Sequence, residues 1–386
     1  MTGTLKGAAA IVGIGQTEFS KESGRTELQL AAEASLAAIT DAGMTTSDID
    51  GAVTFVADQN DELALIRNLG IPELRWMSRT PNGGDAACAV VQHAAAAVAT
   101  GEASAVLVYR AFNERSGRRF GQPNAAGAPQ RPAALNWYLP YGLMTPAQVF
   151  SLGWQRYMSK YGVTNEDFGR YSVVNRKHAA SNPNAWFYQR PITLDDHQSS
   201  RWIVEPILRL LDCCQESDGG VAFVVTSAER ARDLAQPAAQ ITAAKQAHLR
   251  NGSVMYSFLH PDLADLPEAA SLATALWDAS GLRPSDIDVA QVYEAFTPNG
   301  FQILESFGFC GPGEAKDFVA AGELELDGSL PTNTAGGLMG EAYIHGYNLI
   351  TEAVRQVRGT AVNQVDDVTH SMVTTARSAL ILSTPS

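Results

Sequence analysis

The sequence predicts an α/β protein built from two similar β-α-β halves. The first observation is an internal repeat, G-x-x-x-S-D-I-D, which occurs at residues 43–50 and again at 281–288. The second is an alternation of helix and strand signals, in which strands such as "AVLVYRA" and "VAFVVTS" are apolar almost throughout. Strands of that kind are usually covered by helices on both faces. We therefore expect sheets and helices arranged in layers.

The elements follow the same order in both halves. An alanine-rich helix ends at Gly43 in the first copy and at Gly281 in the second, and each is followed by a Ser-Asp start and a strand. A glycine-rich turn then leads into a second helix, within "CAVVQHAAAAVATGEA" in the first half and "GYNLITEAVRQVRG" in the second. A strand closes each half. We assign the halves to residues 1–232 and 233–386.

The first half carries an insertion at about residues 113–206. It opens with "NERSGRRFGQPNAAGAPQR", which is too rich in glycine and proline to be regular, and continues through helices near 148–161 and 165–179. Long insertions often cover a site or contact a partner. Four arginines of the loop can meet a phosphate-bearing ligand or simply face solvent: Arg115, Arg118, Arg119 and Arg131.

Composition excludes several classes of function. The formal net charge of -13 and the pI of about 5.0 give no general attraction for phosphate backbones, so no nucleic-acid partner is expected. The apolar run near the N-terminus is too short for a membrane span, and we expect a cytoplasmic protein. No motif for a metal or a cofactor occurs. The acidic residues of "ADQNDELA", Asp58, Asp61 and Glu62, are expected to form a solvated loop.

Several motifs together resemble the thiolase superfamily. They are the duplicated halves, the "NGGDAACAVVQHAAAAVATGEA" helix start, the "VYEAF" strand end and "NTAGGLMGEAYIHG" before a helix. Within it the chain resembles the thiolase-like lipid-transfer proteins related to sterol carrier protein thiolases, and most of all the steroid side-chain-cleaving aldolases. The resemblance implies a layered αβαβα core and a homodimer. It also implies possible assembly with a small OB-fold and zinc-ribbon protein that binds acyl-CoA.

The reaction positions of a thiolase have changed in this chain. The nucleophilic cysteine of the first half corresponds to Gly84, and Cys88 lies one helical turn further on. The family's Asn or His before "EAF" corresponds to Tyr293, and its histidine in the glycine-rich turn corresponds to Tyr343. The final cysteine segment corresponds to "HSMVTTARS", which contains no cysteine. Thiolase chemistry needs a thiolate, so a different reaction is indicated.

A retro-aldol cleavage of a β-hydroxyacyl-CoA needs no cysteine, only a base for the hydroxyl proton and an acid for the enolate carbon. We predict that Tyr293 and Tyr343 form this acid-base pair, with their individual roles open. His345 is expected to orient Tyr343, to contact substrate or to support the turn. Amides near Gly83 and Gly84 are expected to hold the enolate oxygen. The glycines that bring backbone close to the reacting centre are expected to be Gly336, Gly337 and Gly340.

The predicted products are a ketone and a shorter acyl-CoA. By resemblance, the substrate is a steroid side-chain CoA thioester and the short product is propionyl-CoA. Acyl-CoA is then a substrate, and no separate cofactor is expected. Two alternatives remain open: a non-catalytic acyl-CoA or lipid carrier or structural subunit, and an acyl-CoA thiolase or acyltransferase that uses Cys88 or Cys310.

Overall fold

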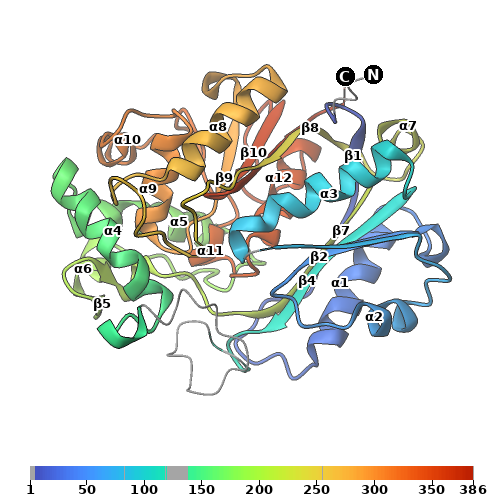
Figure 1. Cartoon of the computed structure of the whole chain (residues 1–386), viewed down its shortest axis with the longest axis horizontal. Helices are drawn as coiled ribbons and strands as arrows, with labels where there is room; N and C mark the ends of the chain where they lie inside the picture. The colour runs from blue at the N-terminus through green and yellow to red at the C-terminus, as the bar shows by residue number, and fades with distance from the viewer. Residues whose placement is uncertain (1–4, 82, 118, 120–137, 254, 386) are drawn as a thin grey trace.

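The computed structural model describes residues 5–81, 83–117, 119, 138–253 and 255–385 (Figure 1). Its centre is a mixed sheet that contains nine strands within these residues, in the order β3-β2-β4-β7-β1-β8-β11-β10-β9. The strands of the sheet are β1 (Ala9–Gln16), β2 (Gly51–Phe55), β3 (Trp76–Thr80), β4 (Ala105–Asn113), β7 (Asp218–Ser227), β8 (Ala239–Gln246), β9 (Val289–Val292), β10 (His370–Thr374) and β11 (Ser378–Ser383).

The strand order has an internal symmetry. In the first half β2 is parallel to β4, β4 is antiparallel to β7, and β7 is antiparallel to β1. The second half repeats this pattern with β9, β10, β11 and β8. The halves join where β1 pairs with β8, through Ala10 opposite Gln240 and Ile11 opposite Ala239. This symmetry confirms the duplicated β-α-β arrangement, while the boundary near residue 232 stays a prediction.

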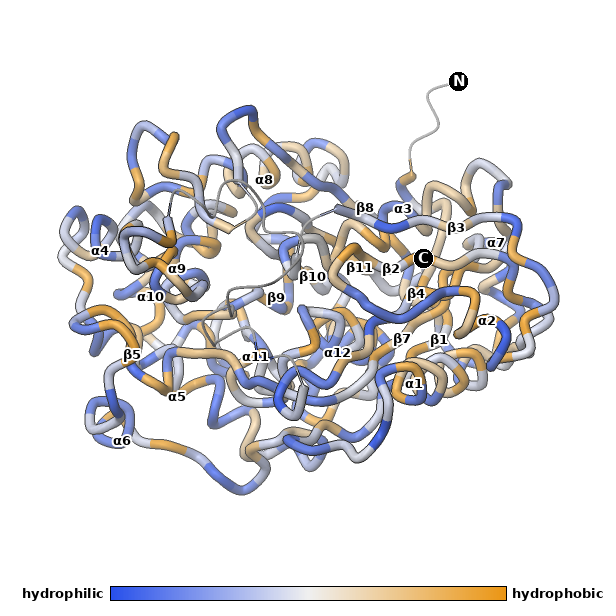
Figure 2. Tube along the Cα trace, turned by 60° about the horizontal axis from the view of Figure 1, so that its bottom comes forward, coloured by the Kyte–Doolittle hydropathy of each residue, from blue (hydrophilic) through white to orange (hydrophobic). Residues whose placement is uncertain are grey.

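Helices cover the sheet in layers. The central pair, α3 (Ala87–Thr100) and α12 (Tyr347–Arg358), contacts strands of both halves, whereas α1 (Glu27–Asp41) covers the first half and α8 (Pro267–Ser280) covers the second. Figure 2 shows hydrophobic segments concentrated along the strands and the helix faces that pack on them. The strands of the two halves therefore count as the two β layers of the expected αβαβα order, with α1 outside the first half, α3 and α12 between the halves, and α8 outside the second. The other helices are α2 (Glu62–Leu69), α4 (Pro146–Tyr161), α5 (Asn165–Ser181), α6 (Leu194–Ser199), α7 (Ala228–Ala231), α9 (Thr297–Ser306), α10 (Ala315–Ala320) and α11 (Gly337–Gly340).

The sequence repeat has the same structural role in both halves. Gly43 and Gly281 follow their helices with φ angles of 70° and 73°, which favour glycine. The carboxylate of Asp50 accepts hydrogen bonds from two backbone amides at the start of β4, at 2.8 and 2.9 Å. Asp288 accepts two bonds of 2.8 Å from the amides of Thr369 and His370 at the start of β10. The last aspartate of each repeat therefore fixes the start of a neighbouring strand.

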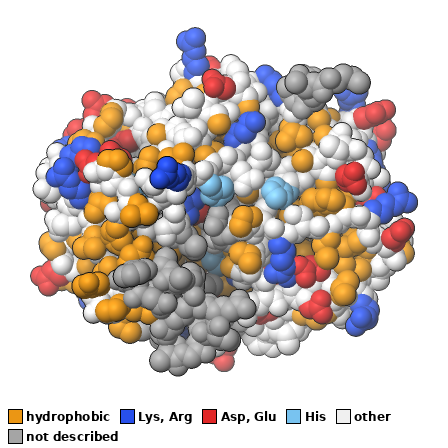
Figure 3. Space-filling view, viewed as in Figure 1, with side chains coloured by type: hydrophobic (Ala, Val, Ile, Leu, Met, Phe, Trp, Pro, Cys, Tyr) orange, Lys and Arg blue, Asp and Glu red, His pale blue; other side chains and the backbone are white. Residues whose placement is uncertain are grey.

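The insertion of the first half packs mainly against the second half. The expected helices are present as α4 and α5, and α5 contacts α9, α10 and α11 (Figure 1). A short hairpin of β5 (Trp202–Val204) and β6 (Leu208–Arg209) follows α6. Figure 3 shows hydrophobic side chains gathered on the left of this face, the side on which Figure 1 places α4. Residues 120–137 of the insertion, which include Arg131, lie outside the described part, as does Arg118.

Among the helices of the described part of the chain, none is long and apolar enough to span a membrane.

Replacement of Asp288 by Ala should lower the free energy of unfolding by about 1–2 kcal/mol, because two strand amides lose their acceptor. Urea denaturation of the variant and the wild type measures this difference. The matched control is Asp327→Ala at an exposed turn position, which should change stability by less than about 0.5 kcal/mol. Equal effects of the two substitutions would contradict the role assigned to the repeat.

Candidate active site

A cavity of about 680 Å³ opens between the insertion and the turns of the two halves. Its wall brings together five of the residues that the sequence predicts for the site: Gly83, Gly84, Tyr293, Tyr343 and His345. The glycines come from the turn before α3, Tyr293 follows β9, and Tyr343 and His345 lie in the turn before α12. Segments far apart in the sequence therefore meet at one place.

The two tyrosines are hydrogen-bonded to each other. Their hydroxyl oxygens lie 2.8 Å apart, and the residues are only 5% and 8% exposed. Burial raises the pKa of both phenols well above the ordinary value. Both hydroxyls are therefore protonated at neutral pH, and each is the hydrogen-bond partner of the other.

Glycine makes room for Tyr293 on two sides. A Cβ atom at Gly84 would overlap the Tyr293 hydroxyl. A Cβ atom at Gly346 would lie 3.0 Å from Cδ2 of the same ring, and Gly346 has a φ of 82°. The tyrosine thus occupies the space that a nucleophilic side chain at position 84 would need. The sequence analysis missed Gly346, although it lies in the same glycine-rich turn.

Backbone contacts hold both tyrosines in place. The amide of Tyr293 donates to the carbonyl of Thr374 at 2.8 Å, and the amide of Tyr343 donates to Oγ of Ser217 at 3.2 Å. Next to Tyr293, the buried carboxyl group of Glu294 accepts a bond of 2.6 Å from the amide of Leu338. These bonds connect the strand end after β9 to the turn that carries Tyr343.

The remaining predicted glycines pack this turn against other elements. Gly336 and Gly340 lie against Ala179 of α5, and a Cβ atom at Gly337 would overlap the carboxylate of Glu294. None of the three is among the residues of the cavity wall. The small size of Gly336 and Gly340 lets the turn lie close to α5, and that of Gly337 lets it lie close to Glu294, so all three act on the tyrosines through the position of the turn.

The cysteines have no features of an activated thiol. Cys88 is fully buried outside the cavity, its Sγ lies 3.6 Å from the carbonyl of Val373, and burial raises its pKa. Burial raises the pKa of Cys310 to about 12. Cys213 and Cys214 line the cavity, but burial raises the pKa of both thiols as well. A thiolate at neutral pH is therefore disfavoured at all four positions.

The hairpin of β10 and β11, which contains "HSMVTTARS", supports the turn before α3. Hydroxyl groups of Thr375 and Ser378 each donate to the carbonyl oxygen of Asp85 at 2.6 Å. These bonds fix the turn that contains Gly84 directly beside Tyr293. The three hydroxyl residues of "TTARS", among them Thr375 and Ser378, were the sequence signal for this support, which the missing cysteine alone does not indicate.

Charged groups lie further along the cavity wall. Glu114 is 2% exposed, and burial together with the charge of Glu216 raises its pKa to about 8. Burial lowers the pKa of Lys21 to about 8, while its Nζ donates to Oε1 of Gln215 at 2.7 Å. Arg115 and Arg119 also line the cavity. Within the described residues, no group of three or more His, Cys, Asp or Glu side chains could hold a metal ion.

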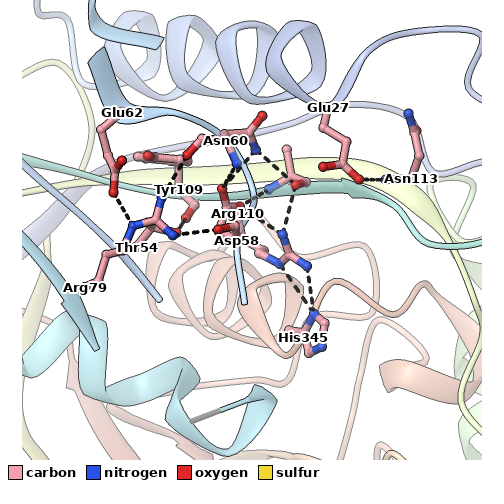
Figure 4. Close-up of polar contacts among 11 residues, drawn as sticks. Glu27, Thr54, Asp58, Asn60, Glu62, Arg79, Tyr109, Arg110, Asn113 and His345 are labelled. Atoms are coloured by element: carbon pink, nitrogen blue, oxygen red, sulfur yellow. Dashed lines mark hydrogen bonds and ion pairs between the residues drawn. The ribbon is translucent and has the colours of Figure 1, made fainter. Parts of the chain in front are cut away.

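A buried polar network lies behind His345 (Figure 4). Asp58 is 2% exposed and forms an ion pair of 2.9 Å with Nη1 of Arg110 on β4, so the expectation that Asp58 is solvated was wrong. Glu62 of the same segment pairs with Arg79, while Asp61 is exposed and caps α2.

Arg110 connects this network to the cavity wall. Its Nε and Nη2 each lie 3.4 Å from Nδ1 of His345. The arginine in the apolar strand "AVLVYRA" was the sequence signal for a buried partner.

The chain is similar over nearly its whole length to known proteins. The chain is 59% identical over 373 residues to the steroid side-chain-cleaving aldolase of Thermomonospora curvata. The aligned residues make up 96% of this chain and 95% of that protein. The chain is also 55% identical to the 17-hydroxy-3-oxo-4-pregnene-20-carboxyl-CoA lyase of Mycobacterium tuberculosis, and the alignment covers 96% of both proteins. A solved structure described as Ltp2-ChsH2(DUF35) aldolase has a TM-score of 0.93 at 56% identity and covers 99% of each chain. The family described as thiolase C-terminal domain-like matches residues 254–383.

Glu114→Gln should stabilise the protein more at pH 7.5 than at pH 5. The raised pKa keeps Glu114 protonated in the folded state up to about pH 8, whereas the unfolded chain releases this proton above about pH 4.5. The free energy of unfolding of the wild type therefore falls as the pH rises from about 4.5 to about 8, by up to about 1.4 kcal/mol per pH unit. Glutamine does not titrate.

Urea denaturation of both proteins at the two pH values measures this effect. The exposed Glu102 provides the matched control, Glu102→Gln, for which the difference from the wild type should not change with pH. A Glu114→Gln difference that is the same at pH 5 and pH 7.5 would contradict the raised pKa.

Proposed function

The chain belongs to the thiolase superfamily, in the family of the steroid side-chain-cleaving aldolases, and we propose that it cleaves a β-hydroxyacyl-CoA by a tyrosine-catalysed retro-aldol reaction. Its class is that of a carbon-carbon lyase. The proposed substrate is the CoA thioester of a steroid side chain with a hydroxyl on the ring carbon that bears it. The proposed products are a ketosteroid and a shorter acyl-CoA such as propionyl-CoA.

The observation that carries the tyrosine mechanism is the 2.8 Å bond between Tyr293 and Tyr343. In one concerted relay, the first tyrosine accepts the substrate hydroxyl proton as it passes its own proton to the second, and the second tyrosine gives its original proton to the α-carbon in the same step. The bond between the hydroxyl-bearing carbon and the α-carbon breaks, its electron pair enters the thioester enolate, and the hydroxyl-bearing carbon becomes a ketone. The pair ends with the protons it started with.

This relay suits two phenols of raised pKa. The proton that leaves the hydroxyl is replaced at the α-carbon, so the reaction needs no lasting phenolate and no proton from solvent. We propose that the amides of Gly83 and Gly84 stabilise the enolate oxygen, because both residues line the cavity and Gly84 lies beside Tyr293. The proposal includes no cofactor beyond the CoA of the substrate.

We further propose that the protein works as a homodimer and together with a second protein. The similar solved structure is named for two components, Ltp2 and ChsH2(DUF35). The resemblance in sequence suggests a small OB-fold and zinc-ribbon protein that binds acyl-CoA. Gel filtration and light scattering of the chain, alone and co-expressed with such a protein, test the two assemblies.

A product assay by mass spectrometry tests the proposed function. The substrate is a steroid CoA thioester with a tertiary β-hydroxyl, offered with and without the co-expressed partner and without added CoA. Equal amounts of ketosteroid and short acyl-CoA are expected. Cleavage that requires added CoA would indicate a thiolase instead, and binding without cleavage under both conditions would indicate a carrier.

Tyr293→Phe and Tyr343→Phe should each lower kcat by about 100-fold or more, because each removes one proton-transfer group. Circular dichroism should show an unchanged fold. Tyr109 is also fully buried but packs on the α1 side, so Tyr109→Phe serves as the control and should keep near wild-type turnover. Wild-type turnover in either cavity variant would contradict the assigned role of that residue.

Gly84→Ala should lower kcat by about 100-fold, because the new Cβ atom displaces the Tyr293 hydroxyl from its partner. Steady-state kinetics measures the loss, and the melting temperature shows how far the fold is retained. A crystal structure of the variant should show the two hydroxyls separated. Full activity, or an unchanged 2.8 Å contact, would contradict this explanation of the glycine.

A further inference from the structure

We propose that Arg176 is an anion-binding residue of the cavity and that it holds a phosphate group of the acyl-CoA. The inference rests on the proposed function for the ligand, but it concerns binding and not cleavage, so the two can be tested apart. Arg176 lies on α5, in the insertion, and is one of the residues of the cavity wall. The sequence indicated four arginines of the preceding loop for such a role, and Arg176 was not among them.

Arg176 is a buried cation without a counter-ion in the described part of the chain. The residue is 7% exposed, and its Nε is enclosed without a hydrogen-bond partner. No ion pair among the described residues includes it. Burial and the positive charge of Arg190 lower its pKa to about 10, so the group stays charged at neutral pH. An anion bound beside Arg176 would offset the free-energy cost of this buried charge.

The packing of Arg176 fixes its guanidinium group at the cavity. The ring of Phe187 lies against it, with 3.3 Å between the ring centroid and Cζ. Phe187 is itself held, because its amide donates to the carbonyl oxygen of Gly340 at 3.3 Å. Both Phe187 and the neighbouring Met339 line the cavity. A guanidinium group supported by a ring keeps its N–H donors in a fork that matches two oxygens of a phosphate.

The cavity wall gathers positive charge, although the chain as a whole has a net charge of -13. The cationic residues of the wall are Lys21, Arg115, Arg119, Arg176 and Arg201. Charges of one sign in a cleft raise the local concentration of ligands of the opposite sign. Arg119 is paired with Glu216 at 2.5 Å, whereas Arg176 has no such partner.

The remaining acidic residues of the wall do not neutralise Arg176 either. Asp85 lies 3.6 Å from Arg377. Burial and the charge of Glu216 raise the pKa of Glu114 to about 8, which keeps this residue mostly protonated at neutral pH. A carboxylate beside Arg176 would raise the pKa of the guanidinium group, whereas that pKa is lowered.

Phosphates are the anionic groups of the proposed ligand. The carboxyl group of the substrate forms the thioester, and a steroid with a hydroxyl group carries no charge. The CoA part carries a pyrophosphate and a 3′-phosphate. Arginine binds phosphate through two parallel N–H···O bonds. Arg176 therefore holds the CoA part of the substrate, while the tyrosine pair acts on its acyl part.

Calorimetric titration with CoA tests the site without any cleavage. It is carried out on the chain alone and on the chain co-expressed with its proposed partner protein. Arg176→Met removes the charge and keeps a side chain that can pack on Phe187, so the Kd for CoA should rise about 10-fold or more. The matched control is Arg190→Met. Arg190 is exposed and its Cζ lies 4.9 Å from the centroid of the same ring, but it is not among the residues of the cavity wall, so its loss should change the Kd by less than about twofold.

Shortened ligands identify the group that Arg176 holds. Pantetheine has no phosphate and should bind weakly and equally to the wild type and to Arg176→Met. Dephospho-CoA lacks only the 3′-phosphate. A loss of affinity as large as that for CoA assigns the contact to the pyrophosphate, and no loss assigns it to the 3′-phosphate.

Three results of these titrations would overturn the proposal. They are a weaker binding of pantetheine to Arg176→Met, an unchanged Kd for CoA, and no binding of CoA to either wild-type preparation. An unchanged Kd together with loss of the partner protein from Arg176→Met would show that an acidic side chain of that protein is the anion instead.

The stability of the ligand-free protein gives an independent test. Because Arg176 has no counter-ion in the described chain, Arg176→Met should not lower the melting temperature, and it should reduce the increase that CoA produces in the wild type. A lower melting temperature with an unchanged response to CoA would show that Arg176 stabilises the fold and would overturn the proposal. Should Arg176→Met fail to fold, Arg176→Lys decides: it keeps the charge without the fork and should bind CoA severalfold more weakly than the wild type, and equal affinity would contradict the proposed contact.

Discussion

The hydrogen bond between the hydroxyls of Tyr293 and Tyr343 is the interaction on which the site depends. Two buried phenols can lie in one cavity only if each hydroxyl finds a partner and each ring finds space. The partner is the other tyrosine, and the space beside Tyr293 exists because residues 84 and 346 have no Cβ atom. A side chain at position 84 and the Tyr293 hydroxyl in its present place exclude each other.

Both halves and the insertion contribute to this arrangement. The second half provides the two tyrosines and His345, while the first half provides the turn with Gly84 and, through β4, Arg110 behind the histidine. The insertion supplies α5, against which the turn of Gly336 and Gly340 packs. The duplicated sheet brings these segments together because β1 pairs with β8 and joins the halves. Aspartates of the sequence repeat fix the starts of β4 and β10 on the two sides of that junction.

Local patterns predicted much of the fold and part of the site. The repeated Gly and Ser-Asp pattern predicted the duplicated fold, and the family resemblance identified Tyr293, Tyr343 and Gly84 as site residues. Contacts between distant segments could not be predicted. Asp58 looked like part of a solvated loop because its partner, Arg110, lies 52 positions away in an apolar strand. Gly336 and Gly340 looked like parts of the reacting centre because only the fold shows that they face α5. A glycine-rich stretch indicates that another part of the protein lies close to its backbone. Which element that is depends on the tertiary structure and cannot be predicted from the stretch itself.

The most direct test of the central claim is a double-mutant cycle on the tyrosine pair. It compares kcat/KM of the wild type, Tyr293→Phe, Tyr343→Phe and the double variant on the same steroid CoA thioester. If the two phenols form one proton relay, either single substitution already breaks it, and the double variant should be only slightly slower than the slower single variant. Losses that multiply across the two positions would show that the tyrosines act independently, and would contradict the relay.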